Sequence, residues 1–173
     1  MKNILIPNLL LLILTSNIKA QSHYEIIVDT VHNNEEILRG EILKSDLENN
    51  PAYTWYRESQ LAYPVPLPAA VAGMKKNRTN VNVVIFGGSW CKDSRFILPK
   101  FFKIQEVSDF PEDRIVIYSV DRAKHMPGTI VEDYHVISIP TIIVMKDGRE
   151  VGRLVEYGKS GQWDKEFADI FSE

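Results

Sequence analysis

The sequence predicts an α/β fold with a central mixed sheet and helices on both of its faces. A near-continuous β-branched run at Val81–Phe86 is typical of a strand that is buried on both sides. From Val81 onward the predicted elements follow the order β-α-β-α-β-β-α. In that order a helix joins two parallel strands, and a hairpin that follows a second helix adds two more. Such an order requires helices on both faces of the sheet.

Length and composition fit one globular domain. The chain has 173 residues, of which 45% are apolar and 25% charged, which excludes extensive disorder and collagen-like repeats. The formal net charge is −3, so we expect neither nucleic acid nor an anionic membrane surface as a partner. A single cysteine, Cys91, excludes an internal disulfide framework and a Cys-rich zinc module. The histidines have no metal-ligand spacing, so no metal and no other cofactor is expected.

Residues 1–20 have the layout of a secretory signal peptide. Lys2 opens the segment, an apolar stretch is densest at Leu9–Leu14, and the small residue Ala20 precedes Gln21. The unbroken apolar run is much shorter than the roughly 20 residues that span a bilayer, which argues against the alternative of an uncleaved anchor. We therefore expect cleavage near residue 20, no membrane span afterwards, and export to the periplasm or the extracellular space.

Cleavage would leave a modestly acidic exported domain. It removes Lys2 and Lys19 and no acid, so 173 − 20 = 153 residues remain, with a charge of 18 − 23 = −5. Exported chains meet oxidising conditions, where a lone thiol is either buried and inert or reacts with another molecule.

Residues 21–78 are predicted to form a helical extension that packs on a domain at residues 79–173. Asn33 and Asn34 resemble helix caps, acids follow them, and apolar residues from Ile37 to Leu47 recur at helical spacing. The extension is expected to contain an edge strand at His23–Thr30, a helix from Asn33 to about Asn49, and helices at Ala52–Ala62 and Ala69–Lys76, with Pro68 in the first turn of the last.

The remaining elements alternate between β-rich runs and helical spacing. Asp147-Gly148 is a strong hairpin signal between two of the strands. The predicted strands are Val81–Phe86, Arg114–Val120, Thr141–Met145 and Glu150–Val155, and the predicted helices cover Phe96–Val107, Thr129–Tyr134 and a segment that starts at Ser160.

Cys91 falls where the first of these strands meets its helix. A thiol at a helix N-terminus is close to unpaired backbone N–H groups and to the positive end of the helix dipole, and both favour the nucleophilic thiolate. The alternative is a buried structural cysteine. The Gly87-Gly88-Ser89 approach and the polar residues Lys92–Ser94 argue against that alternative.

These segments resemble the thioredoxin family. Trp90-Cys91-Lys92-Asp93-Ser94, between a strand and a helix, is similar to the thioredoxin active-site loop, and Ile139-Pro140-Thr141 is similar to the cis-proline loop. The Lys146-Asp147-Gly148 hairpin and the last helix extend the resemblance over Val81–Ser172. The resemblance implies a three-layer α/β/α thioredoxin-like fold.

The resemblance also implies a role for each matching residue. Cys91 would be the attacking cysteine, Trp90 would shield it, and Pro140 would pack beside it. Ile139 would offer main-chain hydrogen bonds to a bound peptide, and Ser94 could donate a hydrogen bond to the thiolate. The predicted site therefore comprises catalytic Cys91 and Ser94 and substrate-binding Trp90, Ile139, Pro140 and Thr141.

Three departures from the family limit the mechanism. Ser94 stands where the family has its second cysteine, so no internal disulfide can close. Ile85 stands where many thioredoxins keep a buried acid, and Glu156 replaces a small residue in the partner groove. The chain can attack a disulfide, but an external thiol or a second client thiol must release the adduct.

Three functions remain open at this point. The first is a monothiol thioredoxin-like protein, a monomer, that exchanges or isomerises disulfides with protein thiols or a small-molecule thiol, or senses redox state. The second is a redox-inactive binding module whose N-terminal helices recognise a protein. The third is a peroxide-reactive thiol, for which Ser89 and Arg95 are poor substitutes for the expected neighbours.

Overall fold

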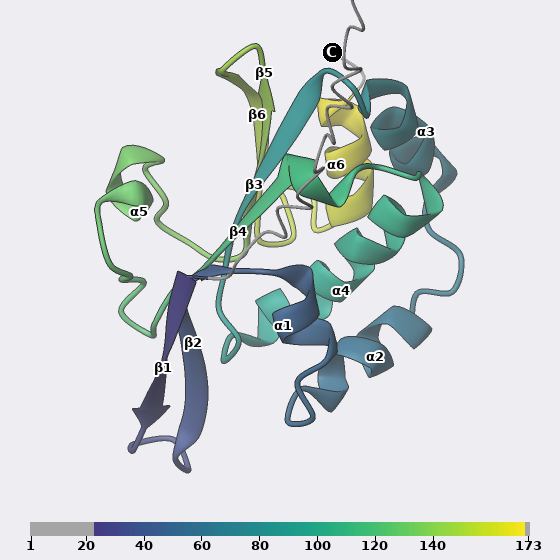
Figure 1. Ribbon diagram of the computed structural model, residues 1–173. Helices are drawn as coiled ribbons and strands as arrows, with labels where there is room; N and C mark the ends of the chain where they lie inside the picture. The colour runs from purple at the N-terminus through teal and green to yellow at the C-terminus, as the bar shows by residue number, and fades with distance from the viewer. Residues whose placement is uncertain (1–22, 172–173) are drawn as a thin grey trace, which may run out of the picture.

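A six-stranded mixed sheet forms the centre of the molecule, whose computed structural model describes residues 23–171 (Figure 1). The predicted signal peptide lies outside the described residues. The strand order is β1-β2-β4-β3-β5-β6. The strands are β1 (His23–Asp29), β2 (Glu35–Ile42), β3 (Val81–Gly87), β4 (Ile115–Ser119), β5 (Thr141–Lys146) and β6 (Arg149–Val155).

The central strand β3 fixes which loops meet at one end of the sheet. It pairs in parallel with β4 and antiparallel with β5. Phe86, near its carboxyl end, is opposite Thr141 at the start of β5, and Gly87 is opposite Ser119 at the end of β4. The loops after β3, after β4 and before β5 therefore lie together at this end of the sheet.

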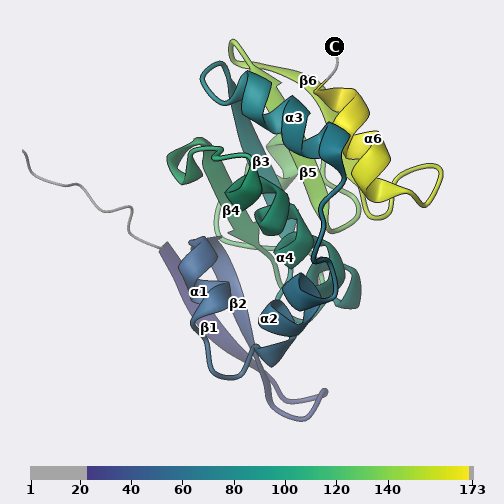
Figure 2. The ribbon, with the colours of Figure 1, turned by 90° about the vertical axis from the view of Figure 1, so that its right-hand side faces the viewer.

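Helices cover the two faces of the sheet unequally. Figures 1 and 2 show the other helices gathered on one face, while α5 lies on the opposite face. The larger core cluster, which includes Phe101, Phe102 and Phe167, is under the helices of the first face, and a smaller one around Phe86 and Ile143 is under α5. The helices are α1 (Lys44–Glu48), α2 (Thr54–Leu61), α3 (Pro68–Asn77), α4 (Lys92–Val107), α5 (Ile130–Asp133) and α6 (Trp163–Ile170), with a short 3₁₀ turn at Glu112–Arg114.

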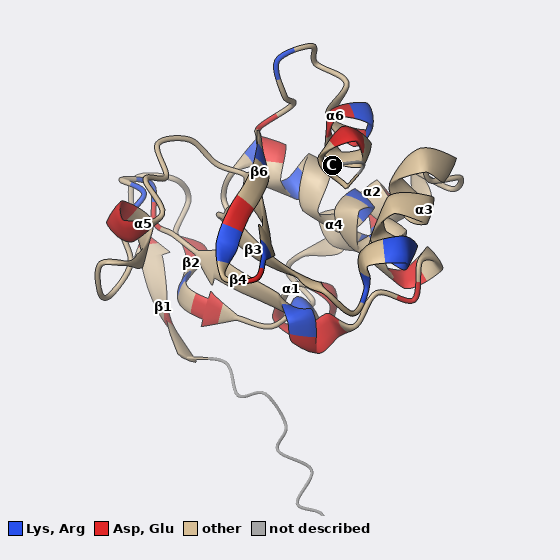
Figure 3. Ribbon diagram, turned by 90° about the horizontal axis from the view of Figure 1, so that it is seen from above, with Lys and Arg blue, Asp and Glu red and all other residues tan. Residues whose placement is uncertain are grey.

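The predicted α/β class and the order of elements from Val81 onward are confirmed. Asp147 and Gly148 have positive φ angles of 51° and 74°, as a tight hairpin turn between β5 and β6 requires. Pro68 occupies the first turn of α3. Figure 3 shows basic and acidic residues side by side along β6 and α1.

The helix predicted from Asn33 to Asn49 is wrong over most of its length. Glu35–Ile42 forms strand β2, which pairs antiparallel with β1 and joins the main sheet through β4. Only Lys44–Glu48 of that segment is helical. Residues 21–78 thus hold helices α1, α2 and α3, but they also supply two strands of the central sheet.

The apolar pattern of this segment fits both kinds of secondary structure. Leu38 and Ile42 are four positions apart, which places them on one face of a helix and also on one face of a strand. Asn33 and Asn34 do not cap a helix, because their φ angles of 58° and 55° place them in the left-handed region that a hairpin turn uses. At these positions asparagine therefore serves a hairpin turn through its tolerance of the left-handed region, and it does not cap a helix.

Strand β1 approaches β2 so closely at position 40 that only a glycine fits there. Its φ angle is +136°, and a Cβ atom there would lie 2.4 Å from the carbonyl oxygen of His23 and 2.8 Å from Cα of Tyr24. A side chain at this position would therefore meet backbone atoms that cannot rotate away.

We predict that Gly40→Ala lowers the free energy of unfolding by about 2–3 kcal/mol, because it adds a backbone clash to an unfavourable φ angle. Gly161→Ala is the matched control, since Gly161 also has a positive φ angle of 76° but nothing lies near its would-be Cβ atom. Its expected loss is about 1 kcal/mol. Urea unfolding of both variants measures the difference, and equal losses would contradict the close packing of β1 on β2.

Candidate active site

Cys91 is the N-cap residue of α4, directly after the loop that leaves β3. Its backbone N–H donates to the carbonyl of Gly88 at 3.0 Å, and its own carbonyl accepts from the N–H of Arg95 at 2.9 Å. The residue is 9% exposed. The predicted position at a helix N-terminus is therefore found, and α4 is a long helix of 16 residues whose dipole acts on this end.

The proline loop lies against the thiol. The Ile139–Pro140 peptide bond is cis, and the Cys91 thiol is 3.7 Å from the Ile139 carbonyl oxygen, to which it donates. The carbonyl of Pro140 accepts a 2.7 Å hydrogen bond from the N–H of Glu156, just after β6. Residues that are 48 positions apart in the sequence thus meet at one sulfur atom.

The side chains of Trp90 and Ile139 lie against the backbone of Gly88, in the loop that leads to Cys91. A Cβ atom on Gly88 would lie 2.7 Å from Nε1 of Trp90 and 3.1 Å from Cδ1 of Ile139. The indole N–H of Trp90 donates to the carbonyl of Val120 at 2.9 Å, so the ring is anchored to the loop after β4. The ring remains partly exposed, and its predicted role in shielding the thiol and contacting partners stays a prediction.

Ser94 and Thr141 lie close to these residues, but their side chains point into the protein. Each is 1% exposed. The Ser94 hydroxyl accepts a 3.2 Å hydrogen bond from the N–H of Gly88, and the Thr141 hydroxyl donates to the carbonyl of Ser138 at 2.7 Å. Both side chains therefore brace the loops around Cys91, and their predicted roles toward a thiolate or a substrate stay predictions.

Comparison with known proteins agrees with this geometry. The family model described as Thioredoxin matches residues 72–166, which is more than half of the chain. The chain belongs to the thioredoxin family. Its single cysteine distinguishes it from a member that holds a cysteine pair in the active-site loop.

Curated relatives of this thioredoxin-family chain are thioredoxins. A rice (Oryza sativa subsp. indica) thioredoxin H-type is 32% identical over 80 residues, which cover 46% of this chain and 61% of the rice protein. A Staphylococcus aureus thioredoxin is 33% identical over 82 residues, which cover 47% of this chain and 74% of that protein. The matched part thus spans about three fifths of the rice protein's length.

A solved structure shows the same fold over a larger share of this family member. A Pseudomonas aeruginosa protein of unknown function aligns with a TM-score of 0.51 at 14% sequence identity. The alignment covers 75% of this chain and 89% of that protein. At this identity the likeness concerns the fold alone.

Sequence reasoning missed two neighbours of the thioredoxin-family site. The hydroxyl of Tyr157, just after β6, donates to the Asp93 carboxylate in the first turn of α4 at 3.2 Å. The Tyr157 ring also packs 5.5 Å from the ring of Phe96. Burial raises the pKa of Tyr157, and the negative charges of Asp93 and Cys91 raise it further. The sequence held no signal for this pair, since its partners are 64 residues apart.

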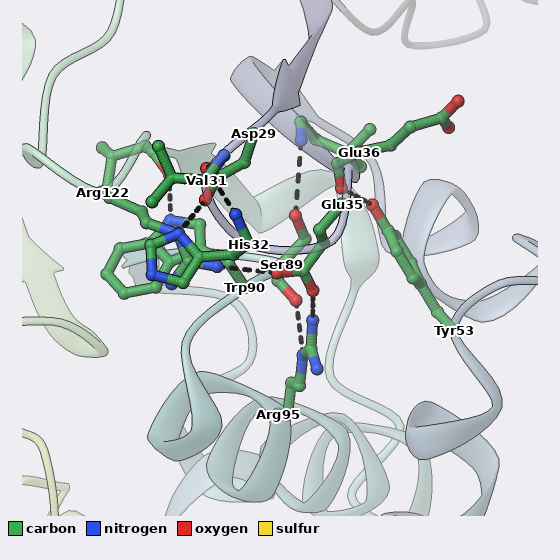
Figure 4. A network of polar contacts seen from close by, with 12 residues as sticks. Asp29, Val31, His32, Glu35, Glu36, Tyr53, Ser89, Trp90, Arg95 and Arg122 are labelled. Atoms are coloured by element: carbon green, nitrogen blue, oxygen red, sulfur yellow. Dashed lines mark hydrogen bonds and ion pairs between the residues drawn. The ribbon is translucent and has the colours of Figure 1, made fainter.

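The β1–β2 hairpin was also missed, and it reaches the thioredoxin-like loop directly (Figure 4). The hydroxyl of Ser89 accepts a 3.3 Å hydrogen bond from the N–H of Leu38 in β2. The carbonyl of Leu38 accepts a 2.7 Å hydrogen bond from the hydroxyl of Ser119 at the end of β4. The hairpin could not be placed from the sequence because its second strand was predicted to be helical.

Residues 23–171 contain neither a metal-binding cluster nor a helix that could span a membrane. No three His, Cys, Asp or Glu side chains in this part of the chain are grouped so that they could hold a metal ion. Over the same residues, no helix combines the length and the apolar character that crossing a bilayer requires.

We predict that Asp93→Asn lowers the pKa of Tyr157 but leaves it above the ordinary tyrosine value. The substitution removes the charge of Asp93, whereas burial, the larger cause of the raised pKa, remains. Phenolate absorbance measured against pH, with Tyr157→Phe subtracted as the blank, gives the shift. An unchanged titration would mean that the Asp93 carboxylate does not act on Tyr157 in solution.

Proposed function

We propose that this protein is an exported, monothiol member of the thioredoxin family that forms mixed disulfides through Cys91. One observation carries the proposal. The only sulfur atom of a cysteine in the chain lies at the N-terminus of α4 and 3.7 Å from the carbonyl beside the cis proline. A helix N-terminus favours the thiolate, which is the nucleophile in disulfide exchange.

The proposed first step is the attack of the Cys91 thiolate on one sulfur of a client disulfide. A new S–S bond forms at Cys91, the client S–S bond breaks, and the second client sulfur leaves as a thiolate. One disulfide replaces another, so the step needs no separate oxidant or reductant. Ile139 and Pro140, which lie against the thiol, would hold the client backbone during the attack.

Release of the client must come from a second thiol outside this chain. Ser94 lies where a second cysteine would attack, and a hydroxyl cannot form a disulfide. If the client's own thiol attacks, Cys91 leaves as a thiolate and the client is isomerised. If a small-molecule thiol attacks the Cys91 sulfur, the client leaves reduced and Cys91 carries the small thiol until a second molecule removes it.

We infer the remaining properties from the sequence and the charge distribution. The partners are protein thiols and disulfides or a small-molecule thiol, and the protein acts as a monomer without nucleic acid. Interspersed acids and bases on β6 and α1 support the absence of a basic nucleic-acid surface there (Figure 3). Export follows from the layout of residues 1–20.

The second candidate is a binding module of the same fold in which Cys91 has no chemical role. The observation that favours it is the 9% exposure of Cys91, since an attacking thiol must be reached by its client. The packing of α2 weakens it, because Tyr53 and Tyr56 are buried against the core and do not form a partner surface.

We predict that the native chain forms reducible adducts with oxidised glutathione and with proteins of the exported fraction. Cys91→Ser should form none, because the serine hydroxyl cannot replace the attacking thiolate. Non-reducing gels and intact-protein mass spectrometry measure the adducts. Absence of adducts from the native chain, or equal adducts with Cys91→Ser, would contradict the proposal.

Ser94→Cys is the matched variant in the same experiment. It restores a second thiol one turn into α4, which can attack the Cys91 mixed disulfide, close a bond between residues 91 and 94, and expel the client as a thiolate. Because this attack is intramolecular, client adducts should disappear about tenfold faster or more. Adducts of unchanged lifetime would mean that Ser94 does not occupy the resolving position.

A further inference from the structure

The turn end of the β1–β2 hairpin extends beyond β4 and lies against the active-site loop (Figure 4). The pairing of β2 with β4 covers only Gly40–Ile42, so the part from Glu35 to Arg39 is free to contact the loops after β3 and β4. Glu35 is the first residue of β2. Its two carboxylate oxygens bind different arginines: Oε1 binds Arg95, and Oε2 binds Arg122 at 2.8 Å.

Arg95 connects Glu35 to the backbone just before Trp90. It lies in the first part of α4, and its Nε donates to the carbonyl of Ser89 at 2.5 Å. Its guanidinium group also lies 5.6 Å from the centre of the Trp55 ring, which limits its movement on the other side. The position of Arg95 therefore fixes the peptide that leads into Trp90 and Cys91.

Arg122 connects the same carboxylate to the ring of Trp90. It lies in the loop after β4, and its guanidinium carbon is 4.9 Å from the centre of the Trp90 ring, within the range of a cation–π contact. Its Nε also binds the carboxylate of Asp29 at the end of β1. Burial alone would raise the pKa of Asp29, but hydrogen bonds from Arg122 and His32 hold it below its ordinary value.

The charged side chains of this network are only partly exposed, which distinguishes it from an ion pair on the open surface. The side chains of Glu35, Arg95 and Arg122 are 27%, 29% and 32% exposed, so water screens them only in part. An arginine that binds a carboxylate and stacks on a ring is held in a defined orientation. Loss of Glu35 would leave Arg95 without its carboxylate and Arg122 with Asp29 alone.

We propose that Glu35 is a positioning residue for the thiol: by binding Arg95 and Arg122 together, it holds Trp90 over Cys91 and limits access to the sulfur. This proposal gives the hairpin a role in the function proposed above and rests on that function for its biological meaning. The physical claim concerns access to one sulfur atom, so it can be tested without any client.

The experiment compares the alkylation rates of Cys91 by iodoacetamide in the full chain, each divided by the rate in denaturant. Glu35→Gln keeps the shape of the side chain but removes its charge, and we expect alkylation to become about fivefold faster. Glu36→Gln makes the same chemical change at the next residue, whose side chain is exposed and faces away from this network in Figure 4. Its rate should equal that of the native chain.

A double-mutant cycle separates positioning through Trp90 from a general loss of structure. In a Trp90→Ala background the thiol has already lost its cover, so Glu35→Gln should add less than about twofold. An equal acceleration in both backgrounds would overturn the proposal, as would equal rates for Glu35→Gln and Glu36→Gln.

Arg122→Gln tests the other end of the contact if Glu35→Gln does not fold. It should accelerate alkylation to a similar extent, since it removes the guanidinium group from the Trp90 ring. A native rate in this variant would overturn the proposal. If the native chain formed no mixed disulfides, the proposed function would be contradicted. The alkylation rates would still test the role of Glu35, because they require no client.

Discussion

The hydrogen bond between the Cys91 thiol and the Ile139 carbonyl joins the two loops on which the candidate site depends. It exists because β3 and β5 are antiparallel neighbours, with Phe86 opposite Thr141, so that the end of one strand and the start of the other share an edge. Gly88 permits the approach, since a Cβ atom there would meet both Trp90 and Ile139. Sheet register, loop composition and helix start thus act together to place one sulfur atom.

The β1–β2 hairpin adds a second set of restraints to the same loop. Hydrogen bonds to Ser89 come from the backbone of β2 and from Arg95, and Trp90 is held between Val120 and Arg122. Because the hairpin belongs to the central sheet, the N-terminal part of the chain contributes to the surroundings of the thiol. Removal of this part would alter the site as well as the stability of the fold.

The elements from Val81 onward could be predicted because their patterns are unambiguous: β3 is a β-branched run, Asp147-Gly148 is a turn pair, and apolar residues recur at helical spacing along α4 after Cys91. Strand β2 could not, since the spacing of Leu38 and Ile42 fits a strand and a helix equally. The contacts of Glu35 and Tyr157 could not be predicted from the sequence for a different reason. Each depends on segments 60 or more residues apart, whose meeting is decided by the sheet order.

The most direct test is the rate at which oxidised glutathione forms a mixed disulfide with Cys91 at neutral pH, measured in the folded and in the denatured chain, with Cys91→Ser as the blank. We expect faster adduct formation in the folded chain, because the thiol lies at the N-terminus of α4 and against the loop of Ile139 and Pro140. Adduct formation that is slower in the folded chain than in the denatured chain would contradict a chemical role for Cys91. Cys91 would then be a structural residue, and the fold would serve binding alone.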